Sequence, residues 1–364
     1  MSFDKGSMNF TVVDLASYDR DKFLENLNGE SYSASNPSFD APVTDVTCGI
    51  SLASTDKDGV SVDDFVLGGL PFFAVRKREL KIDASTVKET VERRILDLTK
   101  SGVDVSSKKK KEIKEDVIDA LSVDASEKLS GVRCVISSTG KFMLVDATSG
   151  KKVEDFIDNI YSFVAMDAFG GSGGLVARSP EAMYSRTSGK GFMDYEQIEM
   201  NHFGTEAGIG EDFLTYLFMA SEIENFFSDG TEVVLAGDIE LADSRETSVG
   251  AKKIVVKEGV PSVAQEVVTA LCSGKKVSSV DLMMSFGGDV YTVTVDSEFR
   301  FKKLTIKDEE KIGDIHARLE SRMLSVSMFL DGFGKIFNKF VESEDSNEKM
   351  IQVWLDEKAN LTKG

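Results

Sequence analysis

The feature that most constrains the fold is a long amphipathic pattern near the C-terminal end, between residues 309 and 341. Its apolar side chains recur every three or four residues, as they do along one face of an α-helix. The stripe consists of Ile312, Ile315, Leu319, Val326, Phe329, Leu330, Phe333, Ile336, Phe337 and Phe340. Because an amphipathic helix gains most of its stability by burying its apolar face, this pattern predicts a folded C-terminal region built around one long helix.

Shorter helical and strand patterns occupy the rest of the chain in irregular order. The predicted helices cover residues 19–27, 86–98, 113–121, 153–164, 213–227 and 263–271. The predicted strands cover residues 132–136, 142–145, 233–235, 239–241, 254–256, 277–284, 290–295 and 299–306. Neighbouring strands are joined by short turns, which is typical of antiparallel pairing. We therefore predict an α+β fold with antiparallel sheets and a long C-terminal helix.

The length of 364 residues exceeds one small core, so we expect several lobes. The expected segments are an N-terminal α+β segment (1–75), a basic helical and hairpin region (76–165), a Gly/Ser-rich loop or linker (166–210), a C-terminal α+β region (211–342) and a polar tail (343–364). The run Gly170–Gly174 supports the linker assignment. It follows a predicted helix and precedes further loop, whereas a phosphate-binding loop lies between a strand and a helix.

Several classes of chemistry lack their usual residues. There are only two histidines, His202 and His316, and no HExxH, GxSxG or GxxxxGK[ST] motif. The cysteines Cys48, Cys134 and Cys272 are far apart, which favours reduced, buried thiols. We see neither a secretory signal at the start nor an apolar run of the roughly 18 residues that a membrane span needs. We therefore expect a cytoplasmic protein with no catalytic residue, no metal site and no cofactor.

The charge balance argues in two directions. The chain has 43 basic and 62 acidic residues, for a net charge of −19, which by itself disfavours nucleic-acid binding. Residues 71–120, in contrast, contain thirteen basic and ten acidic residues. A basic channel can lie within an acidic shell, so the total does not exclude DNA. Acidic pairs such as Asp238 with Glu240, or Asp243 with Glu246, are more typical of solvated surface than of a metal site.

The basic residues are the candidate site. They have two readings: solvated helix ends and turns, or phosphate contacts, which need positive charge but no base-specific geometry. The predicted DNA-binding residues are Arg76, Lys77, Arg78, Lys108, Lys109, Lys110, Lys111, Lys114, Lys128, Lys275, Lys276, Lys302 and Lys303.

The order of several short motifs resembles the RdgC family of recombination-associated proteins. The motifs are AVRKRE (74–79), VKE (87–89), KKKKEIKEDV (108–117), FMLVDA (142–147) and KKVED (151–155), followed by GKKV (274–277) and FKKL (301–304). Each motif is short, and their shared order carries the resemblance. It extends over roughly residues 8–160 and 205–340.

The resemblance implies a horseshoe-shaped subunit that pairs head to head with a second copy. The resulting ring would hold duplex DNA in a positively charged hole and restrain RecA-type strand exchange. The expected partners are therefore double-stranded DNA, a second copy and recombination proteins, with the protein in the nucleoid. The sequence departs from the family at the tip hairpin, where Ser126 replaces an exposed Phe and Lys128 keeps the positive charge.

Three functions thus follow as hypotheses. The leading one is a ring-like homodimer that binds double-stranded DNA without sequence specificity. The alternatives are a metal-dependent exonuclease and an acidic protein-interaction module that has lost DNA binding.

Overall fold

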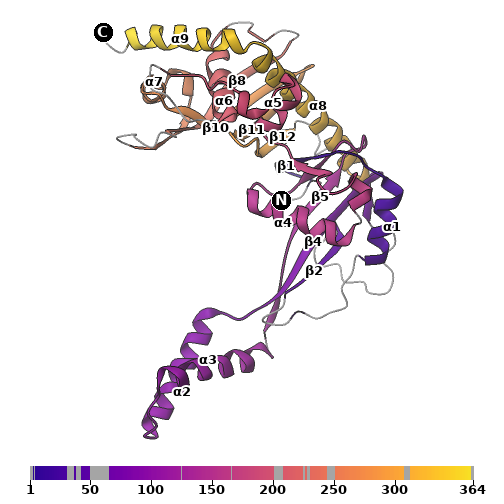
Figure 1. Ribbon diagram of the computed structural model, residues 1–364, viewed down its shortest axis with the longest axis vertical. Coiled ribbons are helices and arrows are strands. Elements are labelled where there is room, and N and C mark those ends of the chain that lie inside the picture. Colours follow the sequence, from indigo (N-terminus) through magenta and orange to yellow (C-terminus); the bar gives the residue numbers. More distant parts are fainter. Residues whose placement is uncertain are drawn as a thin grey trace.

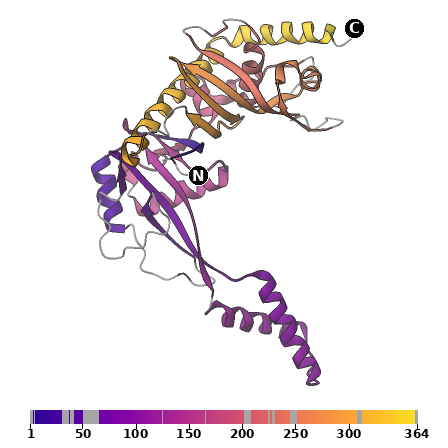
Figure 2. The same ribbon diagram turned by 180° about the vertical axis from the view of Figure 1, so that it is seen from behind.

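The chain folds into an elongated molecule with three parts along its length, seen in a computed structural model (Figure 1). The structure describes residues 3, 5–30, 37, 42–49, 65–123, 125–164, 166–200, 208–223, 226–227, 230–243, 251–306 and 312–361. A C-terminal lobe lies at one end, a pair of helices at the other, and a sheet-based central part between them. Both ends bend toward the same side of the central part (Figure 2).

The described strands form one antiparallel sheet, in the order β2-β4-β5-β6-β1-β12-β11-β10-β8-β9, with β3 beside β4 and β7 beside β1. Their bounds are β1 Met8–Leu15, β2 Val43–Cys48, β3 Val66–Leu67, β4 Leu70–Lys81, β5 Ser126–Ile136, β6 Phe142–Val145, β7 Leu175–Ala177, β8 Glu232–Ala242, β9 Lys253–Gly259, β10 Lys276–Phe286, β11 Asp289–Asp296 and β12 Phe301–Ile306. The predicted hairpin and the predicted meander are both confirmed.

The helices of the described residues are α1 Arg20–Glu30, α2 Ala84–Lys100, α3 Ser107–Ser122, α4 Gly150–Phe163, α5 Pro180–Ser188, α6 Ile209–Ala220, α7 Gln265–Cys272, α8 Ile315–Glu342 and α9 Glu344–Leu361. Together with the antiparallel sheet they confirm the predicted α+β class. None of these helices has the length and apolar character needed to cross a membrane.

Strand β1 connects the central part to the C-terminal lobe. Its first half pairs with β12 through Met8 and Phe10, and its second half pairs with β6 through Thr11–Asp14. Because side chains alternate along a strand, its two faces enter different cores. Phe10 packs in the core of the C-terminal lobe, where its ring stacks on that of Phe301 with centroids 5.2 Å apart, and Val13 packs in the central core.

The long helix α8 provides the aromatic centre of the C-terminal lobe, as its stripe predicts. Phe333, Phe337 and Phe340 are buried, and their ring centroids lie 5.1–5.6 Å from that of Phe213 on α6. Burying one such side chain contributes roughly 1.5–3 kcal/mol. The packing of α6 between α8 and the sheet therefore fixes the shape of this lobe. The first residues of the predicted helix, 309–311, lie outside the described residues.

Residues 166–200 are folded and packed, which corrects the expected loop or linker at 166–210. A 3-10 turn at Met166–Phe169, strand β7 and helix α5 lie within this stretch, and Phe169 and Tyr184 are fully buried. Arg178 and Arg186 bind the carboxylate of Asp14 on β1 at 2.6 and 3.0 Å. Burial would raise the pKa of Asp14, but these two guanidinium groups outweigh it and lower the pKa. Residues 201–207 lie outside the described residues.

Residues 344–361 form helix α9, which corrects the expected polar tail at 343–364. Three of its apolar side chains, Ile351, Trp354 and Leu355, are buried, as is Asn347. The indole N–H of Trp354 donates to Glu222 at 3.0 Å, and its ring meets the edge of Phe218. The helix therefore belongs to the C-terminal core, although only one narrow face of it is apolar. Residues 362–364 lie outside the described residues.

Candidate nucleic-acid interface

The predicted basic region is a projecting arm at one end of the molecule (Figure 1). Strands β4 and β5 pair continuously from Phe72 opposite Val135 to Lys81 opposite Ser126, and carry α2 and α3 at the far end of this ribbon. The side chain of Ser106 caps α3 by accepting from the backbone N–H of Lys109 at 3.3 Å. A ribbon that ends in two capped helices holds the lysine-rich turn away from the central part.

The first turns of α3 carry the strongest positive charge of this arm. Lys108, Lys109, Lys110, Lys111 and Lys114 are all exposed. Lys109 pairs with Glu112 at 3.0 Å, which raises the pKa of Lys109, and Lys111 pairs with Glu115 at 3.7 Å. Lys108, Lys110 and Lys114 form no ion pair with a described residue. These three ammonium groups are therefore available for an anionic partner.

Lys77 and Lys128 lie on the ribbon and share one carboxylate. Each ammonium lies 3.4 Å from Glu79, on neighbouring strands. Hydrogen bonds from Lys128 and then Lys77 lower the pKa of Glu79, so this carboxylate stays ionised. Two lysines against one carboxylate leave a single positive charge at this point of the ribbon.

Arg76 and Arg78 are buried, so the prediction of DNA contact does not extend to them. Arg76 is 0% and Arg78 is 6% exposed. Both bind the fully buried carboxylate of Asp45 on β2, with Nε of Arg76 at 2.7 Å and Nε of Arg78 at 3.1 Å. Their guanidinium groups cannot reach a phosphate outside the protein and instead join β2 to β4.

Lys275 and Lys276 are buried as well, with 8% and 1% exposure, so the predicted DNA contact is corrected for these two residues too. Lys275 pairs with Asp243 at 3.4 Å. Lys276 pairs with Asp212 on α6 and donates to the carbonyl oxygen of Ile198 at 2.8 Å. Burial raises the pKa of Asp212, and the charge of Lys276 opposes that rise. Both lysines are internal ion-pair partners of the C-terminal lobe.

Lys302 and Lys303 lie on β12, close to its pairing with β1. Lys302 is half-buried and binds Asp296 at 2.9 Å. Lys303 is exposed and has a φ of 55°, in the left-handed region that favours glycine. Its backbone N–H donates to Asn9 at 2.7 Å, and its ammonium forms no ion pair with a described residue. Lys303 lies where the register of β12 shifts against both β11 and β1, and this β-bulge accounts for its left-handed backbone.

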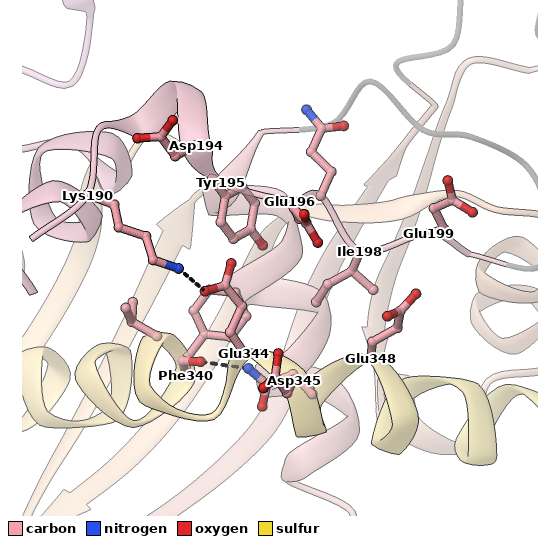
Figure 3. Close-up of a pocket in the computed structure, with 13 residues that line it drawn as sticks. Lys190, Asp194, Tyr195, Glu196, Ile198, Glu199, Phe340, Glu344, Asp345 and Glu348 are labelled. Atoms are coloured by element: carbon pink, nitrogen blue, oxygen red, sulfur yellow. Dashed lines mark hydrogen bonds and ion pairs between the residues drawn. The ribbon is translucent and has the colours of Figure 1, made fainter. Parts of the chain in front are cut away.

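One cluster of carboxylates lies away from the arm, on the C-terminal lobe. A hollow of about 870 Å³ between α9 and residues 190–199 is lined by several carboxylates and a single cation, Lys190, which binds Glu344 at 3.7 Å. Figure 3 shows these side chains around the hollow; the carboxylates belong to Asp194, Glu196, Glu199, Glu344, Asp345 and Glu348. Such a surface repels phosphate, so it is not a nucleic-acid contact.

The acidic partners Asp45 and Asp212 are the residues that sequence reasoning missed. Asp243, which was expected on solvated surface, is instead buried at 6% exposure, and Glu246 lies outside the described residues. Asp45, Val46 and Thr47 are three consecutive buried residues of β2, Val43–Cys48, so this strand does not alternate. The only available signal for Asp45 was an acidic residue within a short strand-like run. Among the described residues, no group of three or more His, Cys, Asp or Glu side chains is arranged to hold a metal ion.

One comparison with known families gives a match. Residues 62–168 match the family model described as "Putative exonuclease, RdgC". The matched stretch contains the β4–β5 ribbon and helices α2, α3 and α4. It confirms the predicted resemblance and indicates a recombination-associated family. No curated protein matches the chain.

The buried Asp45 carboxylate yields a testable prediction. Replacing Asp45 with Asn should lower the free energy of unfolding by about 3–5 kcal/mol, because both buried guanidinium groups lose the Asp45 carboxylate and Arg78 keeps only the more distant, exposed Glu127 at 3.9 Å. Urea unfolding measures this loss. Glu79→Gln is the control, with a much smaller expected loss because its ion pairs are open to solvent. A stable Asp45→Asn variant that binds DNA more tightly would show that Arg76 and Arg78 are accessible after all.

Proposed function

Because residues 62–168 match the RdgC family model, we propose that the chain binds double-stranded DNA without sequence specificity, as a ring-like homodimer that restrains RecA-type strand exchange. The proposed contact residues are Lys77, Lys108, Lys109, Lys110, Lys111, Lys114, Lys128, Lys302 and Lys303. They lie on the arm and on β12, and they retain exposed or half-buried ammonium groups. This location would place the protein on the nucleoid.

The observation that carries the proposal is the set of exposed α3 lysines that form no ion pair with a described residue. Lys108, Lys110 and Lys114 open a helix whose dipole disfavours cations at that end. Flexible ammonium groups suit phosphates, which repeat along any duplex, and do not suit the recognition of particular bases. The arrangement therefore supports binding to DNA of any sequence.

The bent outline supports a dimer that closes around the duplex. Both ends of the subunit turn toward the same side, so that one subunit encloses only part of a space (Figure 2). Exposed apolar side chains occur at both ends, with Val123 84% exposed on the arm and Val263 80% exposed in the C-terminal lobe. In the proposed dimer a second copy would cover these side chains. The proposed lysines would line the space that the dimer encloses, and the acidic hollow would lie outside that space.

The description of the matched family as "Putative exonuclease, RdgC" favours exonuclease activity as a second candidate. Release of nucleotides from end-labelled duplex in the presence of Mg²⁺, lost on replacement of a specific Asp or Glu pair, would establish it. The third hypothesis, a protein-interaction module, is favoured by the acidic total and by Ser126 in place of an aromatic residue. It predicts partner capture that nuclease treatment leaves unchanged, together with no affinity for duplex DNA.

The lysines at the start of α3 give a prediction about affinity for DNA. Lys108→Glu with Lys110→Glu should weaken binding to random-sequence duplex and lower the slope of log K against log salt by about 1.8 per protomer, because two phosphate contacts are lost. Acidic residues are favourable at a helix start, so the helix itself should not be destabilised. Fluorescence anisotropy across a salt series measures the slope.

Lys335→Glu with Lys349→Glu is the matched control. It makes the same change in net charge on exposed positions of α8 and α9. We expect the control to retain the slope of the unmodified protein. Equal losses in both variants would show that total charge, and not the start of α3, determines affinity.

The strained Lys303 gives the second prediction. Lys303→Gly should stabilise the fold by about 0.5–1 kcal/mol, because a left-handed conformation costs a side chain about 1–2 kcal/mol and glycine loses roughly 0.5–1 kcal/mol of chain entropy. DNA affinity should nevertheless fall. Lys303→Ala should lower the affinity equally without the gain in stability. An unchanged affinity in both variants would remove Lys303 from the interface.

A further inference from the structure

A second hollow lies in the central part, between α4 and the sheet. It has a volume of about 450 Å³, whereas one water in the liquid takes about 30 Å³. Its apolar lining comes from Val75 on β4, Val132 on β5 and Phe156 on α4. Val75 and Val132 are directly opposite one another in the β4–β5 ladder. We call it the α4 hollow; its apolar lining is held by a sheet and a helix and not by loops.

The other residues that line the α4 hollow are polar, and two of them are cationic. Lys77 comes from the ribbon and Lys152 from the first turn of α4. The hydroxyls of Thr44 and Ser130 belong to residues that flank Lys77 on the two neighbouring strands. The side chain of Asn159 completes the hydrogen-bonding groups.

Of the two cations that line the α4 hollow, Lys152 is the one whose charge the described ion pairs leave unmatched. Its side chain is exposed and forms no ion pair with a described residue, whereas Lys77 shares Glu79 with Lys128. Two carboxylates compete for it. Asp155 also lines the α4 hollow, and Asp146 interacts with Lys152 without forming an ion pair. An anionic ligand that gains a contact from both lysines can offset this competition.

An apolar surface beside two ammonium groups and two hydroxyls matches one chemical unit of DNA. The backbone repeats an uncharged sugar next to an anionic phosphate, and neither part depends on base sequence. Helix α4 also reaches the side of the central part toward which both ends of the molecule bend, whereas α1 lies on the opposite side (Figures 1 and 2). A duplex held on that side would pass the α4 hollow.

We propose that the α4 hollow is a subsite for one sugar–phosphate unit of the DNA backbone, with Lys152 as a phosphate contact. The proposal rests on the DNA binding proposed above. It adds residues outside the arm and places a contact midway between the arm and the lobe. Lys77 would serve both regions, because its side chain lines the α4 hollow while its strand continues into the ribbon.

The test compares two adjacent lysines. Lys151 and Lys152 are both exposed in the first turn of α4, but only Lys152 lines the α4 hollow. Lys152→Ala should weaken binding to random-sequence duplex by about three- to tenfold and lower the salt slope by about 0.9 per protomer. Lys151→Ala should keep the slope of the unmodified protein. Thermal unfolding should be the same for both variants.

The outcomes separate this proposal from the general function. If the unmodified protein binds duplex but the two variants have equal slopes, the subsite is refuted and DNA binding stands. If the unmodified protein binds no duplex, both proposals are refuted. Titration with inorganic phosphate at constant ionic strength is the third measurement. Phosphate binding that requires Lys152, together with unchanged DNA affinity in Lys152→Ala, would identify a site for a free anion and overturn the assignment to DNA.

Discussion

The pairing of β1 with both β6 and β12 is the interaction on which the rest of the structure depends. One strand of eight residues supplies side chains to two cores, with Phe10 on one face and Val13 on the other. A shift of one residue in its register would exchange these faces and expose both sets of side chains. The relative placement of the central part and the C-terminal lobe therefore rests on an alternation of apolar residues within β1. The ion pairs of Asp14 with Arg178 and Arg186 reinforce it from the outer side.

Burial divides the basic residues into two groups with different roles. Arg76, Arg78, Lys275 and Lys276 are matched to buried carboxylates, and their charges are neutralised inside the protein. A buried ion pair of this kind contributes little net stability, but the loss of one partner is costly. The lysines of the ribbon, α3, α4 and β12 that stay open to solvent are cations that a polyanion can reach. An acidic protein can thus bind DNA locally, since net charge describes the whole surface and affinity depends on the charge near each phosphate.

The elements that could be predicted from sequence are those with strong periodicity. Helices α1 and α8 and the β5–β6 hairpin have regular apolar spacing, and the structure contains all three. Helix α9 was missed because only Ile351, Trp354 and Leu355 mark its buried face, too few for a clear period. The glycine-rich run was misjudged because its composition also suits a flexible linker. A Cβ at Gly174 would lie 1.9 Å from the carbonyl oxygen of Phe169, so glycine is required there by close packing.

The candidate site was harder to predict, because residue type does not reveal on which face of a strand a side chain lies. Strand β4 is buried on both faces from Leu70 to Arg76, and only beyond it does burial alternate, with Lys77 exposed and Arg78 buried. Lys152, in contrast, lies in a motif noted for its resemblance to RdgC, yet its place beside the ribbon depends on how α4 packs on the sheet. Pairing across strands and helix packing are tertiary effects that a single sequence does not display.

The central claim is that duplex DNA lies on the side toward which both ends of the molecule bend. Hydrogen–deuterium exchange of the full chain, with and without a short random-sequence duplex at low salt, tests it most directly. The account predicts slower exchange at the start of α3, at the start of α4 and around Lys303, with no change at the start of α9 beside the acidic hollow. Protection confined to α9 and the outer helix α1, or no protection anywhere, would contradict it.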